Sequence, residues 1–321
     1  MNARRIPILA LMVSIALLAG AGCPGKEGVL IKNMVTRFGK PPVISVYMHY
    51  DKKIKKMDID EYLVGVVAGE MKPGWPLNAY AAQAIIARTF TMEFLSRGGT
   101  RKLHGTDIST NEKEAQAYNA ANIRPVIRKA VEMTKGLVLT YQNRYIKGWY
   151  SASCGGKTAL AKDGLAYKEA EPPYIQSVSC PEEKYTPPDQ FYWQATLTSA
   201  DVNRALKTMN QREIGTLTNL EILRRDARGN RATRLKLVGS SGAAVVEGAD
   251  FRVAVGPEKM RSIWIASDIK KGNGYVALKG RGFGHGVGLC QWGAHAFAKQ
   301  NKSPKAIVMH YYPKSRIEKI W

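Results

Sequence analysis

The most constraining feature of this chain is a glycine-rich segment, Gly280–Ala294, which reads GRGFGHGVGLCQWGA. Glycine at nearly every second position permits backbone conformations with positive φ and lets a ligand approach the main chain closely. The spacing contains neither the dinucleotide-binding pattern G-x-G-x-x-G nor the phosphate-binding pattern G-x-x-x-x-G-K-[ST]. We therefore interpret the segment as a shaped binding surface that carries His285, Gln291 and Trp292.

The chain is strongly basic. Its 321 residues carry a formal net charge of +22, and 45% of them are hydrophobic, which is ample for a core. A charge of this size favours a polyanionic partner or surface, such as nucleic acid, anionic lipid or an acidic cell-wall polymer. The basic residues form no long block and no nucleic-acid-binding motif. We expect no specific nucleic-acid binding, and a simply solvated basic surface stays open as an interpretation.

The N-terminus has the pattern of an export signal over residues 1–22. Arg4 and Arg5 precede an apolar run, and the small residues Ala19–Ala21 follow it. This order is that of a secretory signal peptide. Ala19–Ala21 fits a cleavage site, whereas lipidation of Cys23 would make the chain a lipoprotein, and an uncleaved signal anchor is a third outcome. Each predicts an exported protein of the cell envelope, membrane-attached in the last two cases; we favour the lipid anchor.

The remaining chain is divided by composition into a linker and one large domain. Residues 23–42 are predicted to be a basic linker, and residues 43–321 the domain. Strand patterns dominate from about 191 to 277, whereas helical patterns dominate before and after. This mixed order argues against a regular βαβ repeat and predicts an α+β fold, with a helical lobe and a β-rich lobe.

Two helices are predicted near the start of the domain. An apolar stripe from Ile59 to Val67 follows helical spacing, and Glu70 extends it at about 20° from Ile59. The next helix, Leu77–Ser96, is apolar nearly all round and should be buried, yet it carries Gln83 and Arg88. A buried arginine needs a partner. Glu70 is a candidate for that partner, which leaves a structural ion pair as one interpretation of both residues.

Three cysteines follow Cys23: Cys154, Cys180 and Cys290. In an oxidising compartment a Cys154–Cys180 disulfide is a candidate. A zinc site of the three cysteines with His285 is an alternative, as is a thiol hydrolase that uses Cys154 with His285. No pair has the spacing C-x-x-C. We therefore predict no metal and no cofactor.

Three segments in order carry a family resemblance. They are Asp60–Thr89, with the sequence DEYLVGVVAGEM at its start, then SASCGG at Ser151–Gly156, and GFGHGVGLCQWGA at Gly282–Ala294. Together they resemble the stage II sporulation protein D family, also called the amidase-enhancer domain. The resemblance spans about residues 40–321.

The resemblance implies a peptidoglycan lytic transglycosylase. Such enzymes cut the β-1,4 bond between N-acetylmuramic acid and N-acetylglucosamine and leave 1,6-anhydro ends. The family's catalytic glutamate maps to Glu70, with the glycan in a cleft between the two lobes. The implied partners are peptidoglycan glycan strands and an N-acetylmuramoyl-L-alanine amidase. The residues expected to bind substrate or support catalysis are Gln83, Arg88, Ser151, Ser153, Gly155, Gly156, His285, Gln291 and Trp292.

The sequence departs from the family at one place. Some members bind zinc through two histidines and two cysteines soon after the second helix. Here His104 is kept, but Ser109, Glu114 and Ala115 occupy the other ligand positions. We expect no zinc site of this family type.

Alternatives stay open for the function and for several of its residues. The domain can be a non-catalytic glycan-binding module that enhances an amidase, in which case binding survives the loss of Glu70. His285 can be a structural histidine, and Trp292 can be a packing residue instead of a platform for a sugar ring. Ser151 and Ser153 alternate on a strand and so share one face, where they either contact glycan or close the strand end.

Overall fold

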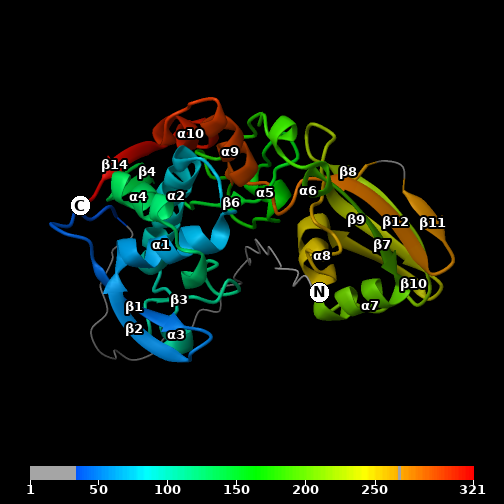
Figure 1. The fold of residues 1–321 in the computed structure, drawn as a ribbon. Coiled ribbons are helices and arrows are strands. Elements are labelled where there is room, and N and C mark those ends of the chain that lie inside the picture. The colour runs from blue at the N-terminus through cyan, green and yellow to red at the C-terminus, as the bar shows by residue number, and fades with distance from the viewer. Residues whose placement is uncertain (1–33, 267–268) are drawn as a thin grey trace, which may run out of the picture.

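The computed structural model describes residues 34–266 and 269–321 of the chain, which fold around two hydrophobic cores (Figure 1). The predicted signal peptide, Cys23 and the start of the predicted linker lie outside the described residues. The described part contains ten α-helices and several small sheets. The prediction of a mixed helix and strand fold is therefore confirmed.

The larger core is helical, with small sheets at its edges. The chain enters it from the N-terminus and returns to it at the C-terminus (Figure 1). Its strands form the sheets β2-β1-β3, β14-β4-β5 and β13-β6. The elements are β1 (Val43–Met48), β2 (Lys53–Asp58), α1 (Ile59–Glu70), α2 (Leu77–Ser96), α3 (Arg101–His104), β3 (Ile108–Ser109), η1 (Ala120–Asn122), α4 (Pro125–Met133), β4 (Leu137–Tyr141), β5 (Arg144–Tyr145), β6 (Tyr150–Ser151), α5 (Ala161–Gly164), η2 (Glu183–Tyr185), β13 (Leu289–Cys290), α9 (Gln291–Lys299), α10 (Pro304–Tyr311) and β14 (Arg316–Lys319).

The smaller core belongs to a β-rich part inserted between β6 and β13. Two antiparallel sheets, β10-β9-β8 and β11-β12-β7, are accompanied by α7 and α8, and this part lies to one side of the helical part (Figure 1). The elements are α6 (Pro188–Phe191), β7 (Tyr192–Thr198), α7 (Ser199–Thr208), β8 (Leu217–Arg225), β9 (Ala232–Gly239), β10 (Gly242–Glu247), α8 (Gly248–Val255), β11 (Lys270–Gly272) and β12 (Tyr275–Arg281).

Helices α1 and α2 form the centre of the larger core. Asp58 caps α1, because its carboxylate accepts a hydrogen bond of 2.7 Å from the Asp60 N–H at the helix start. Sixteen of the twenty residues of α2 are buried. The predicted burial of this helix is confirmed. It packs against α1, which ends at Glu70.

The described end of the predicted linker is packed onto the domain. Val35 N–H donates to the Asn143 carbonyl at 3.1 Å, and Phe38 N–H donates to the Ile320 carbonyl at 2.6 Å. The Phe38 ring also lies edge-on to Trp321, with 6.2 Å between ring centroids. Before β1 begins, the segment therefore contacts Ile320 and Trp321, which follow β14.

Candidate active site

Glu70 is the last residue of α1, and two glycines allow a loop to cross the helix beside it. A Cβ added at Gly69 would lie 2.7 Å from the backbone of Ala117, and one added at Gly65 would lie 2.1 Å from the ring of Tyr118. Only glycine at these two positions lets the loop pass so close to the helix. The crossing brings the Ala117 N–H directly to the Glu70 carboxylate.

The hydrogen-bond partners of Glu70 are all neutral. Its Oε1 accepts from the Ala117 N–H at 2.8 Å and from the Tyr150 hydroxyl at 2.9 Å. The Tyr150 hydroxyl also lies 3.1 Å from Oε1 of Gln116. The Gln291 side chain lies close enough to lower the pKa of Glu70, although its Nε2 makes no full hydrogen bond among the described residues. No ion pair within the described part of the chain involves Glu70.

Burial raises the pKa of Glu70 from 4.5 to about 7. The hydrogen bonds from Ala117 and Tyr150 act in the opposite direction, and the nearby charge of Glu112 adds to the increase. The C-terminal end of a helix also disfavours a negative charge, which acts in the same sense as burial. The side chain is nevertheless only half-buried, so a ligand can reach it. At neutral pH this carboxyl group can hold a proton and can also release it.

The second and third sequence segments meet next to Glu70. Strands β6 and β13 pair in parallel, and Ser153 and Phe283 exchange two backbone hydrogen bonds of 3.0 and 2.8 Å. Gly284, at φ +105°, lies so close to Ser151 that an added Cβ would be 2.8 Å from the serine Cβ. Since Tyr150 belongs to β6 and Gln291 follows β13, the fold brings all three segments to one place.

Several buried side chains near these segments have polar atoms without a hydrogen-bond partner in the described part of the chain. Leaving such an atom unsatisfied costs about 1–3 kcal/mol. A surface that binds a polar ligand supplies the missing partners, as ordered water does. The atoms are both amide atoms of Gln83, Oγ of Ser151, Oγ of Ser153, Nε2 of His285, Nε2 of Gln291 and Nδ1 of His295.

Comparison with known proteins identifies the family. The family model described as stage II sporulation protein matches residues 47–141, a range that includes Glu70. Stage II sporulation protein D of Bacillus subtilis is 27% identical to this chain over 89% of the chain and 82% of its own length. The chain belongs to the stage II sporulation protein D family. A second family model, described as a domain of unknown function, matches residues 166–288.

Two further relatives extend the comparison to longer proteins. An uncharacterized protein of Brachyspira hyodysenteriae is 30% identical over 81% of this chain, and the match spans 66% of that protein. A Bacillus subtilis protein named amidase enhancer is 27% identical over 78% of this chain, and the match spans 39% of the enhancer. The chain therefore corresponds to less than half the length of the enhancer.

Arg88 does not lie beside Glu70, which the sequence offered as its candidate partner. The suggested Glu70–Arg88 pair is wrong, because the guanidinium of Arg88 binds Oδ1 of Asp60 through Nε at 3.0 Å and Nη2 at 2.8 Å. It also donates to backbone carbonyls at the end of α4, including Thr134 at 2.9 Å. The side chain is fully buried. Arg88 thus joins the start of α1 to α4, and it does not reach the candidate site.

His285 is a buried neutral histidine. Its Nδ1 accepts from the Val287 N–H at 3.0 Å, and burial lowers the pKa of its imidazole to about 3, with the Arg252 cation acting in the same direction. The ring makes no hydrogen bond to Glu70 among the described residues, so His285 does not orient the Glu70 carboxyl group directly. Its Nε2 is buried and makes no full hydrogen bond among the described residues, although the Tyr150 backbone lies close enough to raise the pKa of the ring.

Gly155 and Gly156 shape the turn after Cys154, at φ +75° and +95°. This turn lets the Gly156 N–H donate to Oε1 of Glu182 at 2.8 Å. The two glycines therefore shape the backbone around Cys154. The suggested Cys154–Cys180 disulfide is not formed, because both cysteines are free thiols. The Cys154 thiol meets Glu182 at 3.1 Å, which is not the arrangement of a Cys154–His285 nucleophile.

Trp292 is mostly covered by other aromatic side chains. Only 8% of it is exposed, because its ring packs against Trp75 at 4.7 Å and His295 at 5.2 Å between centroids. The ring that stays half exposed is Trp75, in the turn directly after α1. Lys72 of the same turn lies over the Trp292 ring at 5.2 Å.

Sequence reasoning missed three residues of this site. Strand alternation places Tyr150 on the face opposite Ser151 and Ser153, so a prediction based on the two serines does not include it. Gln116 lies in a loop without any motif. Trp75 belongs to no motif, although an aromatic residue five positions after the candidate acid is a usable signal.

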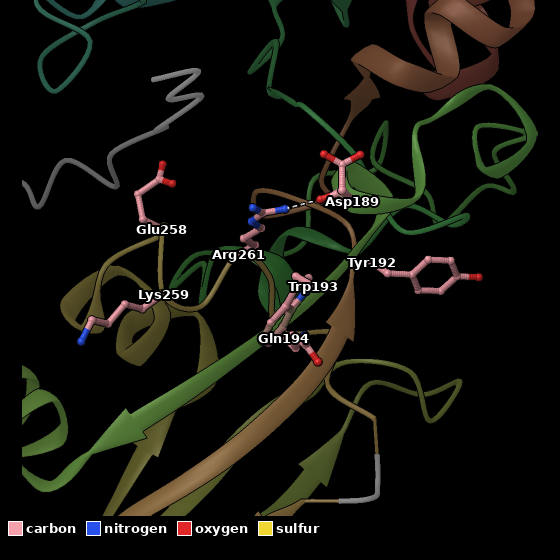
Figure 2. A pocket seen from close by; sticks show the side chains of 7 residues that line it. All are labelled: Asp189, Tyr192, Trp193, Gln194, Glu258, Lys259 and Arg261. Carbon is pink, nitrogen blue, oxygen red and sulfur yellow. Dashed lines mark hydrogen bonds between the residues drawn. The ribbon is translucent and has the colours of Figure 1, made fainter. Parts of the chain in front are cut away.

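A separate hollow of about 270 Å³ lies on the β-rich part (Figure 2). Arg261 points across it and donates to the Asp189 carbonyl at 2.7 Å. None of its lining side chains has an unpartnered buried polar atom, so the surroundings of Glu70 remain the better candidate. The hollow is lined by Asp189, Tyr192, Trp193, Gln194, Glu258, Lys259 and Arg261.

The region of the family zinc site contains a hydrogen-bonded pair. His104 Nε2 lies 2.8 Å from Oε2 of Glu114, and Asn111 donates to the other carboxylate oxygen at 3.0 Å. The His104 ring stacks on Tyr47 at 3.9 Å. The absence of a family-type zinc site stays a prediction.

Among the described residues, no helix is both long and apolar enough to cross a bilayer.

Proposed function

We propose that this protein is a peptidoglycan lytic transglycosylase in which Glu70 acts first as the acid and then as the base. The observation that carries the proposal is the state of Glu70, a half-buried carboxyl group with a pKa of about 7 and only neutral hydrogen-bond partners. A general acid works best when its pKa lies near the working pH. The names of the relatives support a cell-wall-related role at the coarser level.

The proposed reaction needs a single carboxyl group. Protonated Glu70 gives its proton to the glycosidic oxygen, and the bond from that oxygen to C1 of the muramic acid breaks. The resulting carboxylate takes the proton of the C6 hydroxyl of the same sugar while O6 bonds to C1. Since the nucleophile belongs to the substrate, no water and no second carboxylate are required, in contrast to ordinary glycosidases.

Ala117 and Tyr150 would stabilise the ionised form of Glu70 between these two steps. Both donate to Oε1, and such hydrogen bonds favour the carboxylate. Without them the acid would donate its proton less readily. The balance between burial and these two donors therefore sets the pKa of Glu70 at about 7.

The unpartnered polar atoms of Ser151, Ser153, Gln291 and His285 would bind the hydroxyl and N-acetyl groups of the glycan. Trp75, which remains half exposed, is a better platform for a sugar ring than Trp292.

We further propose that the glycan lies where the helical and β-rich parts approach each other. Lys72, two residues after Glu70, donates to the side chain of Gln190 in α6 of the β-rich part. The neighbouring Asp189 lines the hollow of Figure 2. A strand bound at Glu70 could continue past α6 toward this hollow, and the net charge of +22 would favour an anionic wall polymer.

For the location, we propose an exported protein of the cell envelope that Cys23 anchors by lipid. Metabolic labelling with a fatty-acid analogue tests this, because the label should attach to the natural chain and be lost in Cys23→Ala. An unlabelled natural chain would contradict the anchor.

The second candidate function is a glycan-binding module that enhances an amidase, favoured by the name of one relative. The deciding experiment digests purified peptidoglycan, with and without stem peptides, and identifies the new sugar ends by mass spectrometry. The transglycosylase predicts 1,6-anhydro ends that Glu70→Gln abolishes. New reducing ends would indicate a hydrolase instead. Retained wall binding with no new ends on either substrate, and faster release of stem peptides by an added amidase, would favour the enhancer.

A further inference from the structure

A buried cluster of three cysteines and one glutamate lies beside the candidate site. Cys154 follows β6, Cys180 and Glu182 precede η2, and Cys290 is the N-cap of α9. Their ligand atoms, the three Sγ and one carboxylate oxygen, all lie within 4.8 Å of one another. None of the four residues is more than 7% exposed. Residues from three distant segments therefore converge on one enclosed point.

The contacts within the cluster suit a bound cation better than a group of neutral thiols. The sulfurs of Cys154 and Cys290 lie 3.1 and 3.0 Å from the two carboxylate oxygens of Glu182. Thiolates and a carboxylate enclosed together at this point would need a compensating positive charge. A metal ion between these atoms would provide that charge and would hold the thiols as thiolates.

Backbone donors surround the cluster as they do around bound thiolates. The N–H groups of Cys154 and Gly293 both donate to the Cys290 sulfur at 3.3 Å, and the Gly156 N–H donates to Glu182 at 2.8 Å. Donors that orient the ligands in this way are a regular part of metal sites.

Two further residues fit the same arrangement. A Cβ added at Gly293 would lie 2.1 Å from the Cys180 sulfur, so only glycine lets α9 approach that cysteine. The buried Arg231 donates to the Cys154 carbonyl at 2.6 Å and brings a positive charge to the cluster. Three thiolates, one carboxylate and a divalent ion sum to −2, and Arg231 offsets part of that charge.

We propose that Cys154, Cys180, Cys290 and Glu182 bind one Zn²⁺ ion in a closed structural site. Zinc takes four such ligands tetrahedrally, and Zn–S bonds of about 2.3 Å place the sulfurs about 3.8 Å apart. The cluster meets this spacing within the 4.8 Å that its ligand atoms span. This inference replaces our expectation of no metal, and Glu182 takes the place that His285 held in the sequence-based alternative.

The ion would tie together the segments that surround Glu70. Cys290 directly precedes Gln291, and Cys154 directly follows Ser153. Zinc would therefore hold Gln291 and the β6 segment in place without touching the substrate. The proposal rests on the cluster alone and does not depend on the transglycosylase activity.

The test is metal analysis of the full chain, purified under reducing conditions and supplied with zinc chloride. We expect one zinc per chain by mass spectrometry of the elements, and its loss in Cys180→Ser and in Glu182→Gln. His104→Ala is the matched control, because it removes the separate histidine–glutamate pair of His104 and Glu114 and should retain the zinc. With Co²⁺ as the probe, the natural chain should show tetrahedral ligand-field bands and sulfur-to-metal charge-transfer bands.

Three outcomes would overturn the proposal. They are a folded natural chain with no zinc and three titratable buried thiols, a disulfide within the cluster in the protein isolated from cells, and zinc that is lost in His104→Ala but kept in Cys180→Ser. If the cluster variants fail to fold, the Co²⁺ spectrum of the natural chain decides. Bands without sulfur-to-metal charge transfer would contradict thiolate ligation.

Discussion

The two ends of helix α1 each carry a carboxylate, and their surroundings differ. At the start, Asp60 is paired with the buried guanidinium of Arg88 and also accepts from the Trp321 indole N–H at 2.9 Å. At the end, Glu70 accepts only from neutral donors. One carboxylate is therefore held in an ion pair, whereas the other can change its protonation state at neutral pH. The placement of a single cation separates a structural acid from a candidate catalytic one.

The largest effect should come from Glu70→Gln. Removing a general acid typically lowers the rate about 10²–10⁴-fold. We expect a loss of this size in the formation of 1,6-anhydro ends, with binding to the wall retained. Glu61→Gln on the same helix is the matched control, because Glu61 forms an exposed ion pair with Arg128 and its loss should leave the rate unchanged. Equal losses of rate in Glu70→Gln and Glu61→Gln would contradict a specific catalytic role for Glu70.

Next in size is the loss of the ion pair at the start of α1. Arg88→Met leaves Asp60 buried without its cation, which should lower the free energy of unfolding by about 3–5 kcal/mol. Urea unfolding followed by circular dichroism measures this. The double variant with Asp60→Leu should recover part of the loss. A stable Arg88→Met protein that has lost activity would return Arg88 to the catalytic site.

The third prediction concerns stability and pH. Because the folded pKa of Glu70, about 7, exceeds its unfolded value, the folded protein holds a proton that the unfolded chain releases. Its contribution to stability is therefore full below about pH 4.5 and falls as the pH rises to about 7. Glu70→Gln should be about 1–3 kcal/mol more stable than the natural protein at pH 8 and about equal at pH 4. The same difference at both pH values would mean that Glu70 titrates normally.

The smallest effect should come from Tyr150→Phe. Without this hydroxyl the pKa of Glu70 rises, so the alkaline limit of activity should move upward by less than about one pH unit, or about 1.4 kcal/mol. Tyr145→Phe is the control, since Tyr145 bonds to Thr36, away from Glu70. An unchanged alkaline limit in Tyr150→Phe would show that the Tyr150 hydroxyl does not lower the pKa of Glu70.

The sequence predicted the first two long helices of the domain well, because helical periodicity is a local property. The helix Leu77–Ser96 and the position of Glu70 on the apolar stripe of α1 both follow from it. It did not predict which groups pair. Asp60 was the partner of Arg88, but it lies 28 positions away and its own helix face gives no sign of the contact. Glu182 likewise has no spacing that links it to Cys154 and Cys290.

The most direct test of the central claim is the pKa of Glu70 itself. The carboxyl carbon can be titrated by NMR in protein labelled with ¹³C at glutamate, and the signal that is absent in Glu70→Gln assigns it. We predict a midpoint of about 7. A midpoint at or below 4.5 would show that Glu70 is an ion at neutral pH and would contradict its role as the acid.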